Sequence, residues 1–370
     1  MKSSNIQTRV LLAILLLAVL LMLTACTETA APATTTPATG GETTGQTGDA
    51  GADAPVWPAP GMTFNLAVGF APGGTNDAMT RITAPYLERY LGIPVVVQNI
   101  PGAGGLVGHN SVFASPSDGL TAIYTATTDG IFSFYHLSPT ALPWSVDDWR
   151  GTGIWASMMP MGFVSLHTSP WNDFADLIED ARNRPPRDIT IATMGPGRIE
   201  DLWMIEIQEF FGVEFNWVFY EGSAAIQTDL MTGDLDVGII GVAREDFLDH
   251  PEFRVLTGIT AAYPEESIFH GALPVLSDFE DRLNFSMSDL VALDMTPILS
   301  WVVKADTPEY RFEILVEAMR RVAANPDWQE EIRAFTWPTF IAPGEGQEEI
   351  FAEISADFAS FVELHRQYVN

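Results

Sequence analysis

The sequence predicts an α/β protein in which two domains are joined by two crossovers of the chain. The part from Trp57 to Asn370 is too long for one hydrophobic core, because single cores stop growing at about 250–300 residues. Apolar runs typical of buried strands alternate along it with segments of helical periodicity. We expect a first lobe of residues 57–157 plus 261–370 and a second lobe of residues 158–260, with crossovers near Gly153–Pro160 and Thr257–Tyr263.

Two glycine-rich turns, Gly69–Asp77 and Gln98–Gly105, mark the first lobe. Each follows an apolar run (Phe64–Val68 and Pro94–Val97) and precedes a segment with helical periodicity. Free N–H groups and the positive dipole end at a helix N-terminus favour an anion, and glycine lets a ligand approach the backbone closely. One such turn is most often only a tight connection between a strand and a helix. Two matched turns favour a binding site at the sheet edge.

A second α/β series begins with a strand over Ile189–Thr193, a turn over residues 194–198 and a helix over Ile199–Phe211. Arg198, in that turn, could pair with a ligand carboxylate through its fork of donors. The alternatives are a solvated arginine or an ion pair with Glu200 or Asp201. The next strand ends at Tyr220, which could contact a ligand or be a core tyrosine with a satisfied hydroxyl.

The other elements follow from the same periodicities. We expect helices over Leu106–Ser115, Asp173–Arg182 with Asn172 as N-cap, 223–231, Glu309–Ala324, Pro326–Ala334 and Gly346–Tyr368, and strands over Leu120–Thr125, Val213–Tyr220, Gly238–Val242, Arg254–Gly258 and Pro297–Lys304, with two strand pieces in Ile154–Leu166. A polar turn over Thr125–Gly130 follows one strand. Its hydroxyls, Thr127 among them, are either site groups or helix caps.

The N-terminal region predicts export and a lipid anchor. Lys2 and Arg9 precede an apolar run, Val10–Leu23, which is shorter than the roughly 20 residues of a spanning helix. Small residues then lead to Cys26, the single cysteine, as in a bacterial lipobox; the alternative is an ordinary secretory signal with an incidental cysteine. We therefore expect residues 1–25 to be a lipoprotein signal peptide, Cys26 to be lipidated and residues 26–56, rich in Thr, Ala, Gly and Pro, to form a disordered tether.

Charge and motifs exclude several classes of function. The chain carries 18 basic and 48 acidic residues, a net charge of −30, which repels nucleic acid. The six histidines are scattered without metal-ligand spacing, and no nucleophile elbow or phosphate loop occurs in the sequence. Asp77 could be a general base, but a carboxylate in the first turn of a helix is more often a cap or a ligand-orienting group. We expect a binding protein, not an enzyme, with no metal and no cofactor.

Three ordered motifs carry a family resemblance: Ala71-Pro72-Gly73-Gly74-Thr75-x-Asp77, the stretch Pro94–Gly105 with Asn99-x-Pro101-Gly102-Ala103-Gly104-Gly105, and Ser117-Asp118-Gly119-Leu120-Thr121. The sequence resembles the tripartite tricarboxylate transporter receptor family, the Bug-type solute-binding proteins. Tyr220, Gly222, Ser223 and Asp236 extend the likeness. The chain departs from the family pattern at Gln98, Ile100, Arg198 and Glu221, where acidic, Arg, Ser and Lys residues are usual.

The resemblance implies a two-lobed, type II periplasmic-binding-protein-like fold that closes on its ligand by hinge motion. It implies that the turns hold a carboxylate by backbone amides, that Asp77 orients the ligand through ordered water, and that the other side chains set the remainder of the ligand. The candidate ligand-binding residues are Pro72, Gly73, Gly74, Thr75, Asp77, Asn99, Gly102, Ala103, Gly104, Gly105, Thr127, Gly195, Gly197, Arg198, Tyr220 and Ser223.

The implied function is that of an extracytoplasmic receptor on the outer face of the cell membrane. It would capture a small carboxylate solute and deliver it to a membrane carrier made of a large and a small subunit. We expect a monomer that reaches the membrane through its lipid. A sensory receptor for a membrane signalling partner would share every pocket feature, and the substitutions at Gln98, Ile100 and Glu221 leave a neutral or amide solute open.

Overall fold

The computed structural model describes residues 57–126, 128–137, 142–157, 161–242, 247–260, 262–263, 265, 269–290, 298–335 and 337–364. The predicted signal peptide, Cys26, the tether of residues 26–56 and Thr127 lie outside these described residues. Within the described ranges, none of the helices is both long and apolar enough to cross a membrane.

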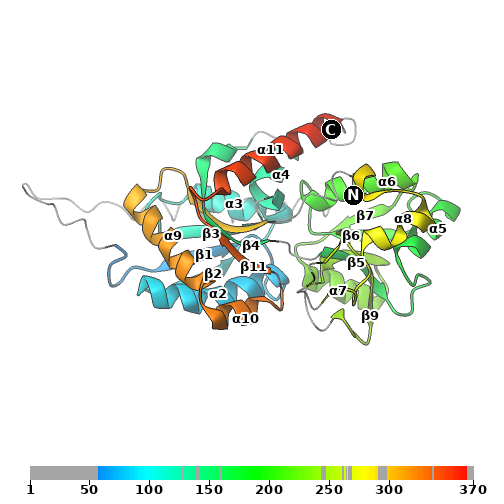
Figure 1. Ribbon diagram of the computed structural model, residues 1–370, viewed down its shortest axis with the longest axis horizontal. Helices are drawn as coiled ribbons and strands as arrows, with labels where there is room; N and C mark the ends of the chain where they lie inside the picture. Colours follow the sequence, from blue (N-terminus) through cyan, green and yellow to red (C-terminus); the bar gives the residue numbers. More distant parts are fainter. Residues whose placement is uncertain are drawn as a thin grey trace, which may run out of the picture. The chain divides into compact units, whose positions relative to one another are not determined.

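The first sheet has six strands in the order β11-β4-β10-β3-β1-β2 (Figure 1). They are β1 (Phe64–Val68), β2 (Val95–Asn99), β3 (Thr121–Ala126), β4 (Trp149–Ser157), β10 (Ile298–Lys304) and β11 (Trp337–Ile341). Strand β1 pairs in parallel with β2 and β3, so all three end at one edge, whereas β10 runs antiparallel to β3 and β4. The two glycine-rich turns follow β1 and β2 at this common edge.

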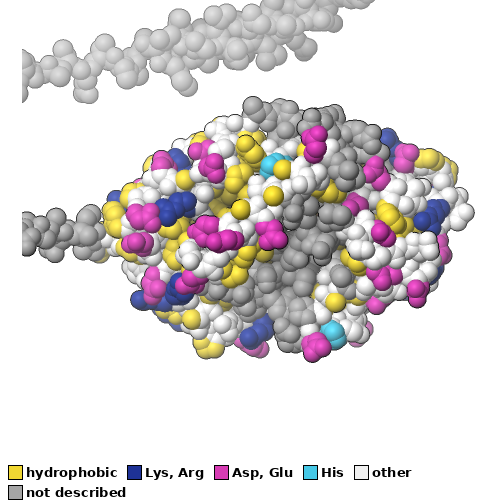
Figure 2. All heavy atoms as spheres, turned by 45° about the horizontal axis from the view of Figure 1, so that its top comes forward, with side chains coloured by type: hydrophobic (Ala, Val, Ile, Leu, Met, Phe, Trp, Pro, Cys, Tyr) yellow, Lys and Arg dark blue, Asp and Glu magenta, His cyan; other side chains and the backbone are white. Residues whose placement is uncertain are grey.

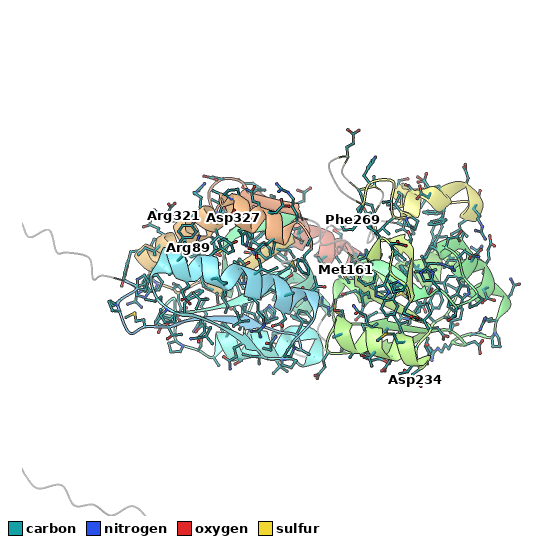
Figure 3. The ribbon with its side chains drawn as sticks, turned by 90° about the horizontal axis from the view of Figure 1, so that it is seen from below. Arg89, Met161, Asp234, Phe269, Arg321 and Asp327 are labelled. Atoms are coloured by element: carbon teal, nitrogen blue, oxygen red, sulfur yellow. The ribbon has the colours of Figure 1, made fainter. Side chains whose placement is uncertain are left out.

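The helices of the first sheet are α2 (Thr75–Leu91), α3 (Leu106–Phe113), α4 (Ser133–Leu137), α9 (Glu309–Ala323), α10 (Pro326–Ile332) and α11 (Gln347–Leu364). Helix α2 packs against α9 and α10. Figure 3 shows Arg89, Arg321 and Asp327 on the exposed surface of this layer. Its core includes Trp155, which stacks on Trp301 with ring centroids 4.6 Å apart.

The second sheet has five strands in the order β7-β6-β8-β5-β9. They are β5 (Met161–Leu166, with Met161 labelled in Figure 3), β6 (Thr190–Thr193), β7 (Asn216–Phe219), β8 (Val237–Gly241) and β9 (Phe253–Gly258), and the helices beside them are α5 (Phe174–Asn183), α6 (Ile199–Phe211), α7 (Ser223–Thr232) and α8 (Glu280–Leu283). Strand β6 is parallel to β7 and β8, so the turns into α6 and α7 lie at one edge of this sheet. Both sheets are mixed, as in type II periplasmic binding proteins.

The chain passes between the sheets twice. It leaves the first after β4 and enters the second at β5; the return falls between Leu290 and β10. The predicted lobe boundary after residue 260 is too early, because Arg282 of α8 forms ion pairs with Asp173 and Glu179 at 3.1 and 2.8 Å. The segment 269–290 thus packs with α5 of the second sheet, and the predicted crossover at Thr257–Tyr263 is wrong.

Several predicted elements also need correction. Helix α5 is capped by Asp173, whose carboxylate accepts from the Asp176 amide at 2.8 Å, and not by Asn172. The polar turn after β3 leads into a π-helical turn, Thr128–Phe132, and then α4, neither of which was predicted. Strand β11 was missed as well; the C-terminal helix is described from Gln347 to Leu364, and its predicted end at Tyr368 lies outside the described residues. Helix α6 has the predicted bounds.

The surface reflects the composition of the chain. Acidic side chains are spread over the face shown in Figure 2, as the net charge of −30 requires. Most of the basic side chains for which the structure shows a contact form ion pairs with acidic side chains, for example Arg150 with Glu309 at 2.7 Å. Such exposed pairs contribute little stability individually.

Candidate functional site

The first turn is held by the carboxylate of Asp77. Its Oδ2 accepts from the backbone N–H of Gly73 at 2.9 Å, and its Oδ1 pairs with Arg81 Nε at 2.9 Å. Burial raises the pKa of Asp77, but the hydrogen bonds from Arg81, Gly73 and Asn99 together outweigh it, so the pKa lies below its usual value. Asp77 is therefore an ionised carboxylate in the first turn of α2 that fixes the preceding turn through Gly73.

Asn99 ties the second turn to the first. Its Nδ2 donates to Asp77 Oδ1 at 2.9 Å and to the carbonyl of Phe70 at 3.0 Å. The two turns also touch directly: a Cβ on Gly69 would lie 2.8 Å from the Cα of Gly105. Only glycine at position 69 permits this approach.

The second turn takes a backbone path that ordinary residues avoid. The φ angles of Gly102, Ala103, Gly104 and Gly105 are 131°, 48°, 66° and 105°. The turn then feeds α3, where His109 Nδ1 lies 3.0 Å from the carbonyl of Gly105. Burial lowers the pKa of His109 to about 4, so its imidazole is neutral at pH 7.

The turn between β6 and α6 brings an arginine into the interior. Arg198 is 2% exposed, and its Nε and Nη2 lie 3.1 and 3.4 Å from the carboxylate oxygens of Glu200, which is 1% exposed. Of the alternatives that the sequence left open, the ion pair with Glu200 is confirmed and the solvated arginine is wrong. A buried pair of this kind leaves the region without net charge.

Asp201, next along α6, is held differently. Its Oδ2 accepts from the Gly197 N–H at 2.7 Å, whereas its Oδ1 is inaccessible to solvent and has no partner among the described residues. Burial raises the pKa of Asp201 to about 7, and the charge of Glu200 adds to this, against the opposing effects of the Gly197 N–H and Arg198.

The β6–α6 turn meets the second turn of the first sheet. Arg198 Nη1 donates to the carbonyl of Gly104 at 2.9 Å, and its guanidinium lies 4.8 Å from the centre of the Phe70 ring. A Cβ on Gly195 would lie 2.6 Å from the N and Cα of Gly104. Backbone therefore packs on backbone between the two sheets at this point.

The turn into α7 meets the first turn in the same way. The Ala71 N–H donates to the carbonyl of Glu221 at 3.2 Å, and a Cβ on Gly74 would lie 3.2 Å from Ser223 Oγ. The N-caps of α2 and α7 are Gly74 and Gly222, and neither helix has a side-chain cap. Two helix N-termini with uncapped amides thus face each other.

A small cavity of about 10 Å³ lies between these helix ends. It is lined by Phe70, Gly74, Thr75, Asn76, Met194, Gly222, Ser223 and Gly241. Asn76 is 5% exposed, and its Oδ1 has no hydrogen-bond partner in the described part of the chain. Since uncapped helix N-termini attract anions, this is the point at which the arrangement favours a negatively charged group.

The predicted site residues differ in where the structure places them. Gly74, Thr75 and Ser223 line the cavity, whereas Gly104, Gly195 and Arg198 form the contact beside it and Gly105 meets Gly69 of the first turn. Asp77 and Asn99 support the turns, while Pro72, Gly73 and Ala103 are exposed. Phe70, Asn76, Met194, Gly222 and Gly241 line the cavity but were not among the predicted site residues. Phe70 and Asn76 lie in the first glycine-rich turn, Met194 in the predicted turn before α6 and Gly222 in the family likeness, so a signal existed for these four.

The hydroxyl of Tyr220 is hydrogen-bonded to an aspartate of α7. The O–H donates to Asp229 Oδ2 at 2.5 Å, and burial together with Asp229 raises the pKa of the phenol to about 12. The interpretation of Tyr220 as a packing residue with a satisfied hydroxyl therefore has direct support.

Two larger cavities, of about 500 and 800 Å³, include none of the predicted site residues. The first lies under α11, and the second runs beside β7. Among the described residues, no group of three or more His, Cys, Asp or Glu side chains could hold a metal ion.

Two mixed α/β sheets whose helix N-termini meet define a binding protein of the type II periplasmic kind. Residues 79–337 match the family described as the tripartite tricarboxylate transporter family receptor, and the chain belongs to this family. Its members are solute-binding receptors, not enzymes.

Two curated relatives match part of this chain. A UPF0065 protein from Pseudomonas sp. (strain P51), encoded between tcbD and tcbE, is 29% identical over 186 residues, 50% of this chain and 54% of that protein. The protein BugT of Bordetella pertussis is 27% identical over 231 residues, 62% of this chain and 70% of that protein. The chain thus spans about half the length of the first relative.

Solved structures share the fold. MatC from Rhodopseudomonas palustris, with bound malate, superposes with a TM-score of 0.69 at 17% identity and covers 84% of this chain and 100% of its own. R. palustris Rpa4515, with adipate, has a TM-score of 0.68 at 22% identity and covers 84% and 98%.

Proposed function

We propose that this protein is an extracytoplasmic receptor that captures a small carboxylate-containing solute between two α/β lobes. The observation that carries the proposal is the meeting of α2 and α7, whose uncapped N-termini face one cavity from different sheets. Paired N–H groups and dipoles hold an anion there without a basic side chain. The malate and adipate bound by the structural relatives support this chemistry.

The capture step follows from the contacts between the turns. The cavity holds about one water molecule, so a solute enters only when the Ala71–Glu221 and Arg198–Gly104 contacts part. The sheets are joined by two chain passages, which suits hinge motion. Closure then brings the amides of both helices onto the solute.

Delivery and location complete the proposal. Lipidation of Cys26 and a tether of residues 26–56 would keep the receptor, a monomer, on the outer face of the cell membrane. Family membership supports delivery to a carrier with a large and a small membrane subunit. Loss of uptake of the bound solute after gene deletion, restored by the wild-type chain but not by Cys26→Ser, is the expected result.

Binding itself is tested by thermal unfolding of the purified protein with mono-, di- and tricarboxylates and their neutral amides. A solute at a hundred times its dissociation constant adds about 2.7 kcal/mol to the free energy of unfolding. We expect stabilisation by a carboxylate and none by its amide. Stabilisation by the amide alone would favour a neutral solute. No stabilisation by any of these compounds would contradict the proposal.

A further inference from the structure

The contact between Gly195 and Gly104 restricts the length of any solute held at the α2 and α7 N-termini. Backbone already meets backbone on this side of the cavity, and Arg198 Nη1 donates to the Gly104 carbonyl at 2.9 Å. Both contacts part when a solute enters, and a solute that extended from the cavity along the second turn would keep them apart after closure. A short solute would let the turns close again, so that both contacts re-form.

The charges around the cavity limit the solute to one anionic group. None of the described residues that line the cavity is a lysine or an arginine. Arg198, the nearest described cation on the second-sheet turns, has its charge balanced by Glu200 at 3.1 Å. Arg81 is likewise paired with Asp77 at 2.9 Å. Among the described residues at the cavity, a second carboxylate would therefore meet no cation whose charge is not already balanced, in a strongly acidic protein.

Asn76 indicates a donor on the solute. Its side chain lines the cavity and is 5% exposed, and Oδ1 has no partner among the described residues. Leaving a buried acceptor unpaired is unfavourable, so a solute whose hydroxyl donates to Asn76 would be selected. Ser223 lines the same cavity and offers a second hydroxyl contact.

We propose that the receptor selects short 2-hydroxymonocarboxylates, of the size of glycolate or lactate, and that Arg198 with Gly195 excludes dicarboxylates. This inference rests on the proposed function at the same site. The carboxylate lies on the amides at the starts of α2 and α7, and the hydroxyl donates to Asn76 Oδ1. Arg198 acts as a specificity-determining residue through the Gly104 turn.

Isothermal titration of the purified protein with six acids tests the inference. Glycolate and lactate are compared with acetate and propionate, which lack the hydroxyl, and with malate and adipate, which carry a second carboxylate. We expect lactate or glycolate to bind at least tenfold more tightly than acetate, propionate, malate and adipate.

Two variants separate the contributions. Asn76→Leu removes the acceptor while keeping the same branched arrangement of heavy atoms, and should abolish the preference for the hydroxy acids. The double variant Arg198→Leu with Glu200→Gln removes both buried charges together, so that neither is left unpaired, and should bring malate within tenfold of lactate. Circular dichroism confirms that each variant is folded.

The outcomes also separate this inference from the proposed function. Tighter binding of malate or adipate than of lactate by the wild type overturns the inference and leaves the carboxylate receptor standing. Equal binding of lactate and propionate overturns the role of Asn76. Absence of binding by all six acids, with none of the larger carboxylates active in thermal unfolding, overturns both.

Discussion

Asn99 and Asp77 lie on different turns and are joined by a hydrogen bond of 2.9 Å from Asn99 Nδ2 to Asp77 Oδ1. The same asparagine donates to the Phe70 carbonyl, and Asp77 accepts from the Gly73 N–H. The two glycine-rich turns are thus one hydrogen-bonded unit. Their shape before ligand arrives is set by side chains that do not themselves line the cavity.

Replacing Asn99 by Ala should therefore weaken both the fold and the site. The change removes one donor from Asp77 Oδ1, which keeps its ion pair with Arg81, and leaves the part-buried Phe70 carbonyl without the Asn99 bond, at a cost of about 1–3 kcal/mol. Urea denaturation measures the stability and titration with the bound carboxylate measures the affinity. Asn183→Ala is the control, because that exposed asparagine only donates to the Glu179 carbonyl. Equal effects of the two substitutions would contradict the role of Asn99 in holding the two glycine-rich turns together.

Gly69→Ala should destabilise the protein through steric overlap alone. Its new Cβ would lie 2.8 Å from the Gly105 Cα, and backbone cannot yield as a flexible side chain does. We expect a loss of about 1–3 kcal/mol, the usual range for overpacking. Gly61→Ala, where φ is +91° and nothing lies within 4 Å, carries backbone strain without the overlap. Wild-type stability and affinity in Gly69→Ala would show that the turns do not touch.

Asp201 should give the protein a measurable pH dependence. Its pKa is about 7 in the folded state and 3.8 ordinarily, so between these values the folded state holds a proton that the unfolded state has released. Stability from this group therefore falls as the pH rises from about 4 to 7. Asp201→Asn should lose less thermal stability than the wild type between pH 5 and pH 8.

Asp306→Asn is the control for this pH series, because Asp306 is exposed. Its stability should follow the wild type at each pH. The same change of stability with pH in the wild type and both variants would refute the assignment to Asp201.

Tyr220→Phe should separate packing from ligand contact. The hydroxyl donates to Asp229 at 2.5 Å, and its removal leaves that carboxylate without the bond. We expect a loss of about 1–2 kcal/mol in the free energy of unfolding and less than a twofold change in carboxylate affinity. A loss of carboxylate affinity greater than tenfold with unchanged stability would indicate that Tyr220 contacts the ligand.

The sequence predicted the elements that depend on local signals. The bounds of α6 follow from its apolar spacing and the preceding glycines, and the turns after β1 and β2 follow from glycine density. The partner of Arg198 could not be predicted from the sequence, because Glu200, solvent and a ligand were all possible partners. The structure shows it bound to Glu200 and to the Gly104 carbonyl. Position 104 is remote in sequence, so only the fold reveals that contact.

The errors have comparable causes. Asp173 and Asn172 are both good N-caps, and local sequence does not choose between adjacent caps. Strand β11 was missed because its five residues contain Pro338, which argues against a central strand, and it is indeed an edge strand. The late return to the first sheet depends on Arg282 meeting α5, a long-range contact without a local pattern.

The central claim is that a carboxylate binds between the N-termini of α2 and α7. Its most direct test is titration of lactate into the wild type and into Ser223→Trp, whose indole would fill the cavity beside Gly74. The account predicts saturable binding to the wild type and none to the folded variant, with the same contrast for any other carboxylate that binds. Undiminished binding to Ser223→Trp would place the carboxylate elsewhere and contradict the account.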